Sequence, residues 1–229
     1  MRKNQIYIFL IFIICSSCDL RTAEEYYNIA FDLEEKGEYK KAIEFLDKAI
    51  EKKPKYRAAL INRGADKAEI GDFKGAIEDY KKIIDFDSDN TMVLMNIGNN
   101  YKRLKQNEKS VDFYTRALST KGAIKSDSTY WEINISSDFD KDKDYHLRKF
   151  EIEYERGIVY AKIGKHKLAI RDLKQAVKFN YEKPNSLIWI GESYLYLKDT
   201  ISAIKYLKES ANLGMVDAKE ILNKIEENK

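Results

Sequence analysis

The chain has little of what most catalytic and metal sites need, because its 229 residues include two histidines and two cysteines. His146 and His166 belong to no Ser/His/Asp set and to no metal-ligand spacing, and no phosphate-binding loop is present. We therefore expect a non-catalytic protein with no metal, no cofactor and no small-molecule substrate. An enzyme would need an unexpected pocket in the segment 125–149.

An excess of charge of one sign is also missing, since 41 Lys and Arg stand against 38 Asp and Glu. A nucleic-acid-binding protein would need a basic face, so nucleic acid is not an expected partner. Most of the mixed charges are interpreted as a solvated outer surface.

No hydrophobic run is long enough to cross a membrane. The longest, residues 6–14, is far shorter than the roughly 20 residues that a spanning helix needs. Arg2 and Lys3 precede it, and Ser16 and Ser17 follow it. A basic start, a short apolar core and small residues are typical of a signal peptide that is removed, here residues 1–17.

The end of this segment, Cys15-Ser16-Ser17-Cys18, resembles the lipobox of bacterial lipoproteins, although Cys15 stands where leucine is usual. The resemblance implies that Cys18 becomes the new N-terminus and carries acyl chains such as palmitate. The protein would then be anchored to a membrane of the cell envelope, on the outer-membrane or periplasmic side. The alternative is a signal segment with an incidental cysteine. Residues 18–22 would form a tether whose last four residues reach about 14 Å.

Beyond the tether, two ladders of small residues recur with steps of 34, 34, 59 and 34 residues. The first ladder consists of Ala30, Gly64, Gly98, Gly157 and Gly191, and the second of Ala42, Ala76, Ser110, Ala169 and Ala203. A fixed period of this kind predicts stacked helix-turn-helix units. The units are 23–56, 57–90, 91–124, 150–183 and 184–217.

Each unit has two apolar-periodic stretches, as expected for amphipathic helices. Gly37, Gly71 and Gly164 follow the first stretch of three units, where a left-handed residue would end a helix. The small ladder residues predict close helix crossings, with the second ladder as the contact that faces the first. Thr22 and Glu25 fit a capping box at the start of the first helix.

These units resemble the tetratricopeptide repeat, with a large residue at position four, Gly or Ala at eight and Ala at twenty. The resemblance covers residues 23–217 apart from the insertion. Lys67, Glu153 and Tyr181 depart from the pattern. The resemblance to this repeat implies an all-α, right-handed α-solenoid, with units in 23–124 and 150–217. Residues 218–229 are assigned to a C-terminal capping helix. The amphipathic pattern of this helix starts slightly earlier, near residue 215, and places Val216, Ile221, Leu222 and Ile225 on its apolar face.

In this family the first helix of each unit lines a concave groove that binds a peptide or a helix. Transferred by position, the predicted groove residues are Tyr27, Phe31, Ile61, Asn62, Met95, Asn96, Asn99, Tyr154, Ile158, Ile188, Trp189 and Tyr196. Some of the apolar members could instead pack against neighbouring units. The family's carboxylate clamp would need basic residues where Tyr27, Met92 and Asn96 stand, so chaperone tails are excluded as ligands.

The insertion 125–149 interrupts the period. Its residues 130–135 could form a short strand or an adhesive patch, and a helix is expected to resume near Asp144. The aspartates at 138, 140, 142 and 144 do not fit an EF-hand, because Lys143 and Lys149 occupy the positions of its glycine and glutamate. A binding loop and a permissive surface insertion both remain open.

The sequence thus predicts a lipid-anchored, non-catalytic adaptor that binds an envelope protein or peptide in its groove. The alternative is a structural subunit of an envelope or secretion complex that packs through its convex face or its insertion.

Overall fold

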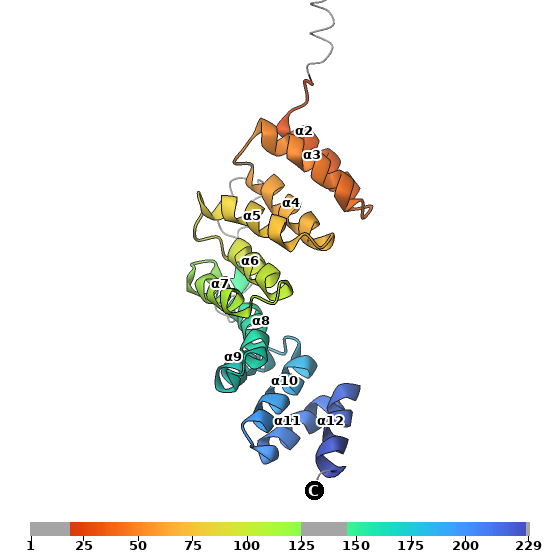
Figure 1. Cartoon of the computed structure of the whole chain (residues 1–229), viewed down its shortest axis with the longest axis vertical. Coiled ribbons are helices and arrows are strands. Elements are labelled where there is room, and N and C mark those ends of the chain that lie inside the picture. The colour runs from red at the N-terminus through yellow and green to blue at the C-terminus, as the bar shows by residue number, and fades with distance from the viewer. Residues whose placement is uncertain (1–18, 125–145, 228–229) are drawn as a thin grey trace, which may run out of the picture.

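The computed structural model describes residues 19–124 and 146–227. In these residues the chain forms helices that follow one another along the long axis of the molecule, with one short pair of strands (Figure 1). The helices are α2 (Ala23–Glu34), α3 (Tyr39–Lys52), α4 (Arg57–Glu69), α5 (Phe73–Ile84), α6 (Thr91–Arg103), α7 (Asn107–Ser119), α8 (Lys149–Lys162), α9 (His166–Lys178), α10 (Lys183–Tyr196), α11 (Thr200–Asn212) and α12 (Val216–Glu227). The predicted all-α solenoid is confirmed.

Each helix packs mainly against its neighbours in sequence, from α2 against α3 to α11 against α12. We number the antiparallel pairs in order: first α2–α3, second α4–α5, third α6–α7, fourth α8–α9 and fifth α10–α11. Because each pair also packs on the next, their apolar faces form an extended core. Its largest side chains with almost no exposure include Tyr26, Tyr80 and Tyr114.

The close crossing inside each pair explains the first ladder, but the facing residue differs from our prediction. A Cβ atom added to Gly98 would lie 2.7 Å from the ring of Tyr114, four residues beyond Ser110 in the second ladder. The reason is that long helical side chains lean toward the N-terminus of their own helix. Ser110 contacts backbone instead, and its hydroxyl donates to the carbonyl oxygen of Gly98 at 2.8 Å. The equivalent facing residues in the second, fourth and fifth pairs are Tyr80, Leu173 and Leu207.

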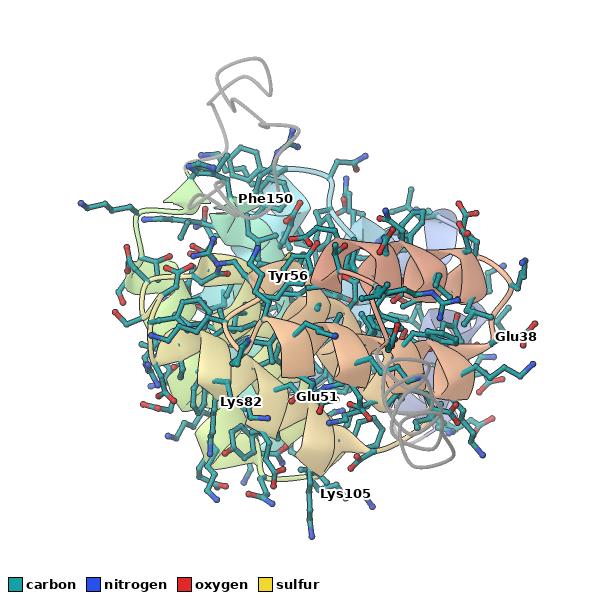
Figure 2. All side chains as sticks on the ribbon, turned by 90° about the horizontal axis from the view of Figure 1, so that it is seen from above. Glu38, Glu51, Tyr56, Lys82, Lys105 and Phe150 are labelled. Atoms are coloured by element: carbon teal, nitrogen blue, oxygen red, sulfur yellow. The ribbon has the colours of Figure 1, made fainter. Side chains whose placement is uncertain are left out.

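The turn inside each pair contains one residue with positive φ at the same position of the repeat. Gly37, Gly71 and Gly164 have φ of 71°, 86° and 75°, which confirms the predicted left-handed turns. In the third and fifth pairs this residue is Lys105, with φ of 58°, and Lys198, with φ of 62°. The Lys105 side chain points away from the body of the molecule (Figure 2).

The start of the solenoid is fixed by local hydrogen bonds. The Thr22 hydroxyl accepts from the backbone N–H of Glu25 at 3.1 Å, and the Glu25 carboxylate accepts from the N–H of Thr22 at 2.8 Å, so the capping box is confirmed. The Lys52 ammonium donates to the backbone oxygen of Asp19 at 2.9 Å. Cys18 and the signal segment lie outside the described residues. None of the described helices has the length and apolar character required to cross a membrane.

The two ends of the insertion come together. Strand β1 (Ala123–Ile124) pairs in parallel with strand β2 (Leu147–Arg148), and the N–H of Leu147 donates to the carbonyl oxygen of Gly122 at 2.8 Å. The expected resumption of helix near Asp144 is wrong, because Leu147 and Arg148 are extended and α8 begins at Lys149. Since α7 and α8 pack directly, the solenoid continues across the insertion. The residues 130–135 and the aspartates 138–144 lie outside the described residues.

Helix α12 packs against α11 at the C-terminal end of the solenoid (Figure 1). Ala218 is fully buried there, and Ile221, Leu222 and Ile225 are half-buried. Val216 was expected on the same face, but it is 61% exposed because it is the first residue of the helix, beside the α11–α12 turn.

Candidate functional site

The predicted groove residues all lie on the first helices of the pairs, but they differ in how accessible they are. Phe31 and Tyr196 are exposed, at 48% and 73%, whereas Ile158 is buried among the core residues of the fourth pair. Ile158 therefore packs in the core of the fourth pair, and little of its side chain is left to line a groove. The other nine are half-buried: Tyr27, Ile61, Asn62, Met95, Asn96, Asn99, Tyr154, Ile188 and Trp189.

Several of these half-buried apolar side chains also support the core. Met95 and Ile61 pack against the cluster that runs through the second and third pairs, and Tyr154 and Trp189 pack against the cluster of the fourth. The apolar stripe thus has a structural role in addition to any binding role.

A first cavity of about 500 Å³ opens between α4, α5, α6 and α8. Asn96 and Asn99 line it from α6, so the structure brings these two predicted residues together. The buried Tyr114 hydroxyl donates to Oδ1 of Asn99 at 2.6 Å. This bond fixes the side-chain amide and directs its NH2 group away from the tyrosine, where it can donate to a ligand.

An ion pair closes one side of this cavity. The Lys102 ammonium of α6 donates to the Glu155 carboxylate of α8, and both side chains line the cavity. The two residues are 53 positions apart because the insertion separates their helices in sequence. Their pairing fixes α6 relative to α8 across the insertion.

A second cavity of about 310 Å³ lies between α8, α9 and α10. Trp189 and Tyr196 line it, and the ring of His166 stacks on Tyr196 with centroids 4.5 Å apart. The buried hydroxyl of Ser193 faces no hydrogen-bond partner among the described residues. Sequence reasoning missed this contact, since only the packing of α9 beside α10 brings His166 to Tyr196.

Carboxyl side chains of the first and second helix pairs lie close to one another. The Asn62 amide of α4 donates to the Glu34 carboxylate of α2 at 2.9 Å and approaches the Tyr27 hydroxyl at 3.5 Å. Burial and the neighbouring Glu34 raise the pKa of Asp66 to about 7, and burial also raises the pKa of Glu34. Glu34 and Asp66 were not predicted, because they come from different units and only stacking makes them neighbours.

Comparison with known proteins identifies the fold. Two segments of the chain, residues 23–56 and 93–123, each match a model of the tetratricopeptide repeat. The fold is a tetratricopeptide-repeat solenoid. Among solved structures, that of MamA protein is similar with a TM-score of 0.67 at 19% identity, covering 88% of this chain and 94% of that chain.

Two further solved structures agree with this solenoid over most of the chain. YrrB, described as a TPR protein with an unusual peptide-binding site, has a TM-score of 0.67 at 16% identity and covers 87% of this chain and 90% of that one. PilF of Pseudomonas aeruginosa has a TM-score of 0.60 at 19% identity, with 83% and 75% covered. No curated protein sequence matches the chain.

The solenoid carries no basic clamp at the positions tested from the sequence, because Tyr27, Met92 and Asn96 occupy them. Tyr27 packs instead on Tyr56, with ring centroids 5.4 Å apart. Within residues 19–124 and 146–227, no three His, Cys, Asp or Glu side chains are grouped so that they could hold a metal ion.

Proposed function

We propose that this protein is a non-catalytic adaptor of a bacterial cell envelope, anchored by a lipid on Cys18, that binds a peptide or helix of another envelope protein. The observation that carries the proposal is the pair of cavities along the helix pairs. The first is lined by three asparagines among charged and aromatic side chains, and the second by the rings of His166, Trp189 and Tyr196. An extended peptide presents backbone donors and acceptors together with alternate side chains. Oriented amides suit its backbone, and aromatic cavities suit its apolar side chains.

The likeness to YrrB supports binding of this kind, since that protein is described as having a peptide-binding site. The anchor is supported by the resemblance of residues 15–18 to a lipobox. Asp19 contacts Lys52, so a lipid on the preceding residue would hold the first helix pair near the membrane surface.

Crosslinking in membranes tests the groove. We expect Trp189→Ala with Tyr154→Ala to lose the crosslinked partner, while the matched variant Tyr39→Ala with Ile201→Ala, on α3 and α11, keeps it. The reverse result would favour the structural-subunit alternative, for which the 86% exposure of Ile201 on α11 is the best support.

Metabolic labelling with a fatty-acid probe tests the anchor separately. The wild-type chain should be labelled and Cys18→Ser should not be. Equal labelling of both would rule out lipidation at Cys18 and would leave the groove proposal standing.

A further inference from the structure

Among the described residues, no cation pairs with the carboxyl groups of Glu34 and Asp66, unlike those of the buried Asp79 and Asp172. Asp79, which lies on α5, receives hydrogen bonds from Arg63, Lys67 and Lys82. Asp66 is only 3% exposed, yet its Oδ2 atom has no hydrogen-bond donor among the described residues. Asp66 and Glu34 hydrogen-bond to each other through their side chains, which requires one of the two carboxyl groups to be protonated. A cation that replaced this proton would leave both carboxylates ionised and paired.

The charged surroundings of Asp66 also oppose its ionisation. Glu34 from α2 and Glu69 from its own helix both act on Asp66 as like charges, and the Tyr80 hydroxyl of α5 is the other titratable group near it. On the side of α6, Lys102 and Arg103 line the adjoining cavity together with Glu69, and Lys102 is already paired with Glu155. The cluster therefore attracts a cation that the described part of the chain does not supply.

Carboxyl and amide oxygens from two helices and the ring of Phe31 offer the kinds of contact that a guanidinium group makes. Glu34 and Asp66 offer carboxylate oxygens from two helices, and Asn62 uses its NH2 group on Glu34, which leaves its own oxygen as a further acceptor. Phe31, half exposed, precedes Glu34 by three residues and so shares its helix face. A planar guanidinium can pair with a carboxylate through two N–H groups and lie flat on the ring, whereas an ammonium acts as a point charge without a plane to stack.

We propose that Glu34 and Asp66 are the anchoring site for an arginine side chain of the partner segment. The inference rests on the proposed groove function and adds the chemistry of the ligand to it. Glu69 and Asn96 extend the site into the first cavity, so the segment that follows the arginine would run along α4 and α6.

The site makes binding depend on pH in a stated direction. Only ionised Asp66 attracts a cation, and the pKa of Asp66 in the free protein is about 7. Arginine binding therefore releases a proton, and affinity should rise as the pH increases from about 6 to about 8. Neither an ordinary surface carboxylate nor a merely structural Asp66 would titrate ligand affinity in this range.

The test uses the full chain in detergent and three short peptide pools that differ at one fixed position, which holds arginine, lysine or citrulline. Citrulline keeps the shape of arginine without its charge. We expect the arginine pool to bind about tenfold more tightly than the citrulline pool, as for a charge-assisted hydrogen bond. Lysine should fall between them.

Matched variants assign the effect to the site. Glu34→Gln with Asp66→Asn should reduce arginine binding to the citrulline level and remove its pH dependence. The control, Glu108→Gln with Asp112→Asn, makes the same change of charge on exposed residues of α7 and should behave as wild type. Circular dichroism melts of both double variants show whether each is folded, and the pH series on the wild-type chain needs no variant.

The outcomes separate the two proposals. If arginine and citrulline pools bind equally, or if the Glu34→Gln, Asp66→Asn variant keeps the arginine preference, the anchoring site is wrong and the groove stands. If no pool binds the wild-type chain, the groove proposal itself fails. A preference for lysine over arginine would overturn the guanidinium assignment.

Discussion

The second and fourth helix pairs differ from the third and fifth in the two residues that meet at the centre of each pair. In the second pair the guanidinium of Arg63 donates through Nε to Asp79 at 2.8 Å, and in the fourth Arg156 donates to Asp172 at 2.7 Å. Both aspartates are almost fully buried. The equivalent positions in the other two pairs hold apolar or aromatic residues, namely Ile97 and Phe113, and Ile190 and Tyr206.

The arginines also join their pair to the one before. Arg63 donates through Nη1 to Asp47 of α3, and Arg156 donates through Nη1 to Thr115 of α7 at 3.0 Å. An isoleucine at the same position can only pack. The comparison shows that one backbone framework accepts either an ion pair or an apolar pair in the same place, and that the ion pair adds directional contacts between repeats.

The same pairs differ in their turns. The second and fourth pairs have glycine at the residue with positive φ, and the third and fifth have Lys105 and Lys198. A lysine in this conformation carries backbone strain that glycine does not. The third and fifth pairs thus combine an apolar centre with a strained turn.

The largest loss of stability is expected when one partner of the ion pair in the second helix pair is removed. Asp79→Ala leaves Arg63 buried beside α5 with only Asp47 as partner, which we expect to lower the free energy of unfolding by about 3 kcal/mol or more. Urea denaturation followed by circular dichroism measures the loss. The control Glu78→Ala, an exposed neighbour on the same helix, should change little. An equal loss in both variants would contradict a role for the buried pair.

A smaller loss of stability is expected when the glycines at the helix crossings of the third and fourth pairs are replaced. Gly98→Ala places a Cβ atom 2.7 Å from the Tyr114 ring, whose hydroxyl is held by Asn99, whereas Gly157→Ala meets the more adaptable Leu173 at 2.8 Å. We expect a loss of about 2 kcal/mol at Gly98 and less at Gly157. Thermal melts of the two variants give the order. Equal losses would mean that the tyrosine yields as easily as the leucine.

Giving the second pair the two central residues of the third pair should avoid most of the loss of stability expected for Asp79→Ala. Arg63→Ile with Asp79→Phe removes both members of the buried pair together, and the remaining partners of Asp79, Lys67 and Lys82, keep some access to solvent. We therefore expect stability within about 1–2 kcal/mol of wild type. The same urea series measures it beside Asp79→Ala. A double variant as unstable as the single one would show that the two types of pair cannot be exchanged in this framework.

The smallest change in stability is expected when the positive-φ residues of the turns are exchanged between glycine and lysine. Lys105→Gly should raise stability by about 1 kcal/mol or less, because relief of strain is partly offset by the greater freedom of glycine in the unfolded chain. Gly71→Lys should lower stability by a similar amount. Differential scanning calorimetry of the two proteins tests both signs, and a loss on Lys105→Gly would contradict the strain argument.

Much of the fold could be predicted from the sequence because the repeat is local. The ladders located the close crossings, and Gly37, Gly71 and Gly164 marked three turns, since glycine is the residue that tolerates a left-handed turn most easily. Lys105 and Lys198 gave no such signal. The contact that faces Gly98 was assigned to Ser110 and belongs mainly to Tyr114, because the sequence does not state which way a side chain leans.

The candidate site could be predicted only in part. Positions in the repeat predicted the helices that carry the candidate groove residues, and of these residues Asn96, Asn99 and Trp189 line the two cavities. Ile158 was assigned to the groove and is buried, because accessibility depends on how closely the next pair approaches. His166 was missed for the same reason.

The sequence by itself determined the period, the helices and the position of the insertion. These features follow from hydrophobic periodicity and turn chemistry within about 34 residues, the length of one repeat. The tertiary structure decided which residues of different pairs meet: Glu34 with Asp66, Lys102 with Glu155, Arg63 with Asp47. Those contacts depend on the spacing and rotation between stacked pairs, which side-chain packing sets and which the period of the sequence does not encode.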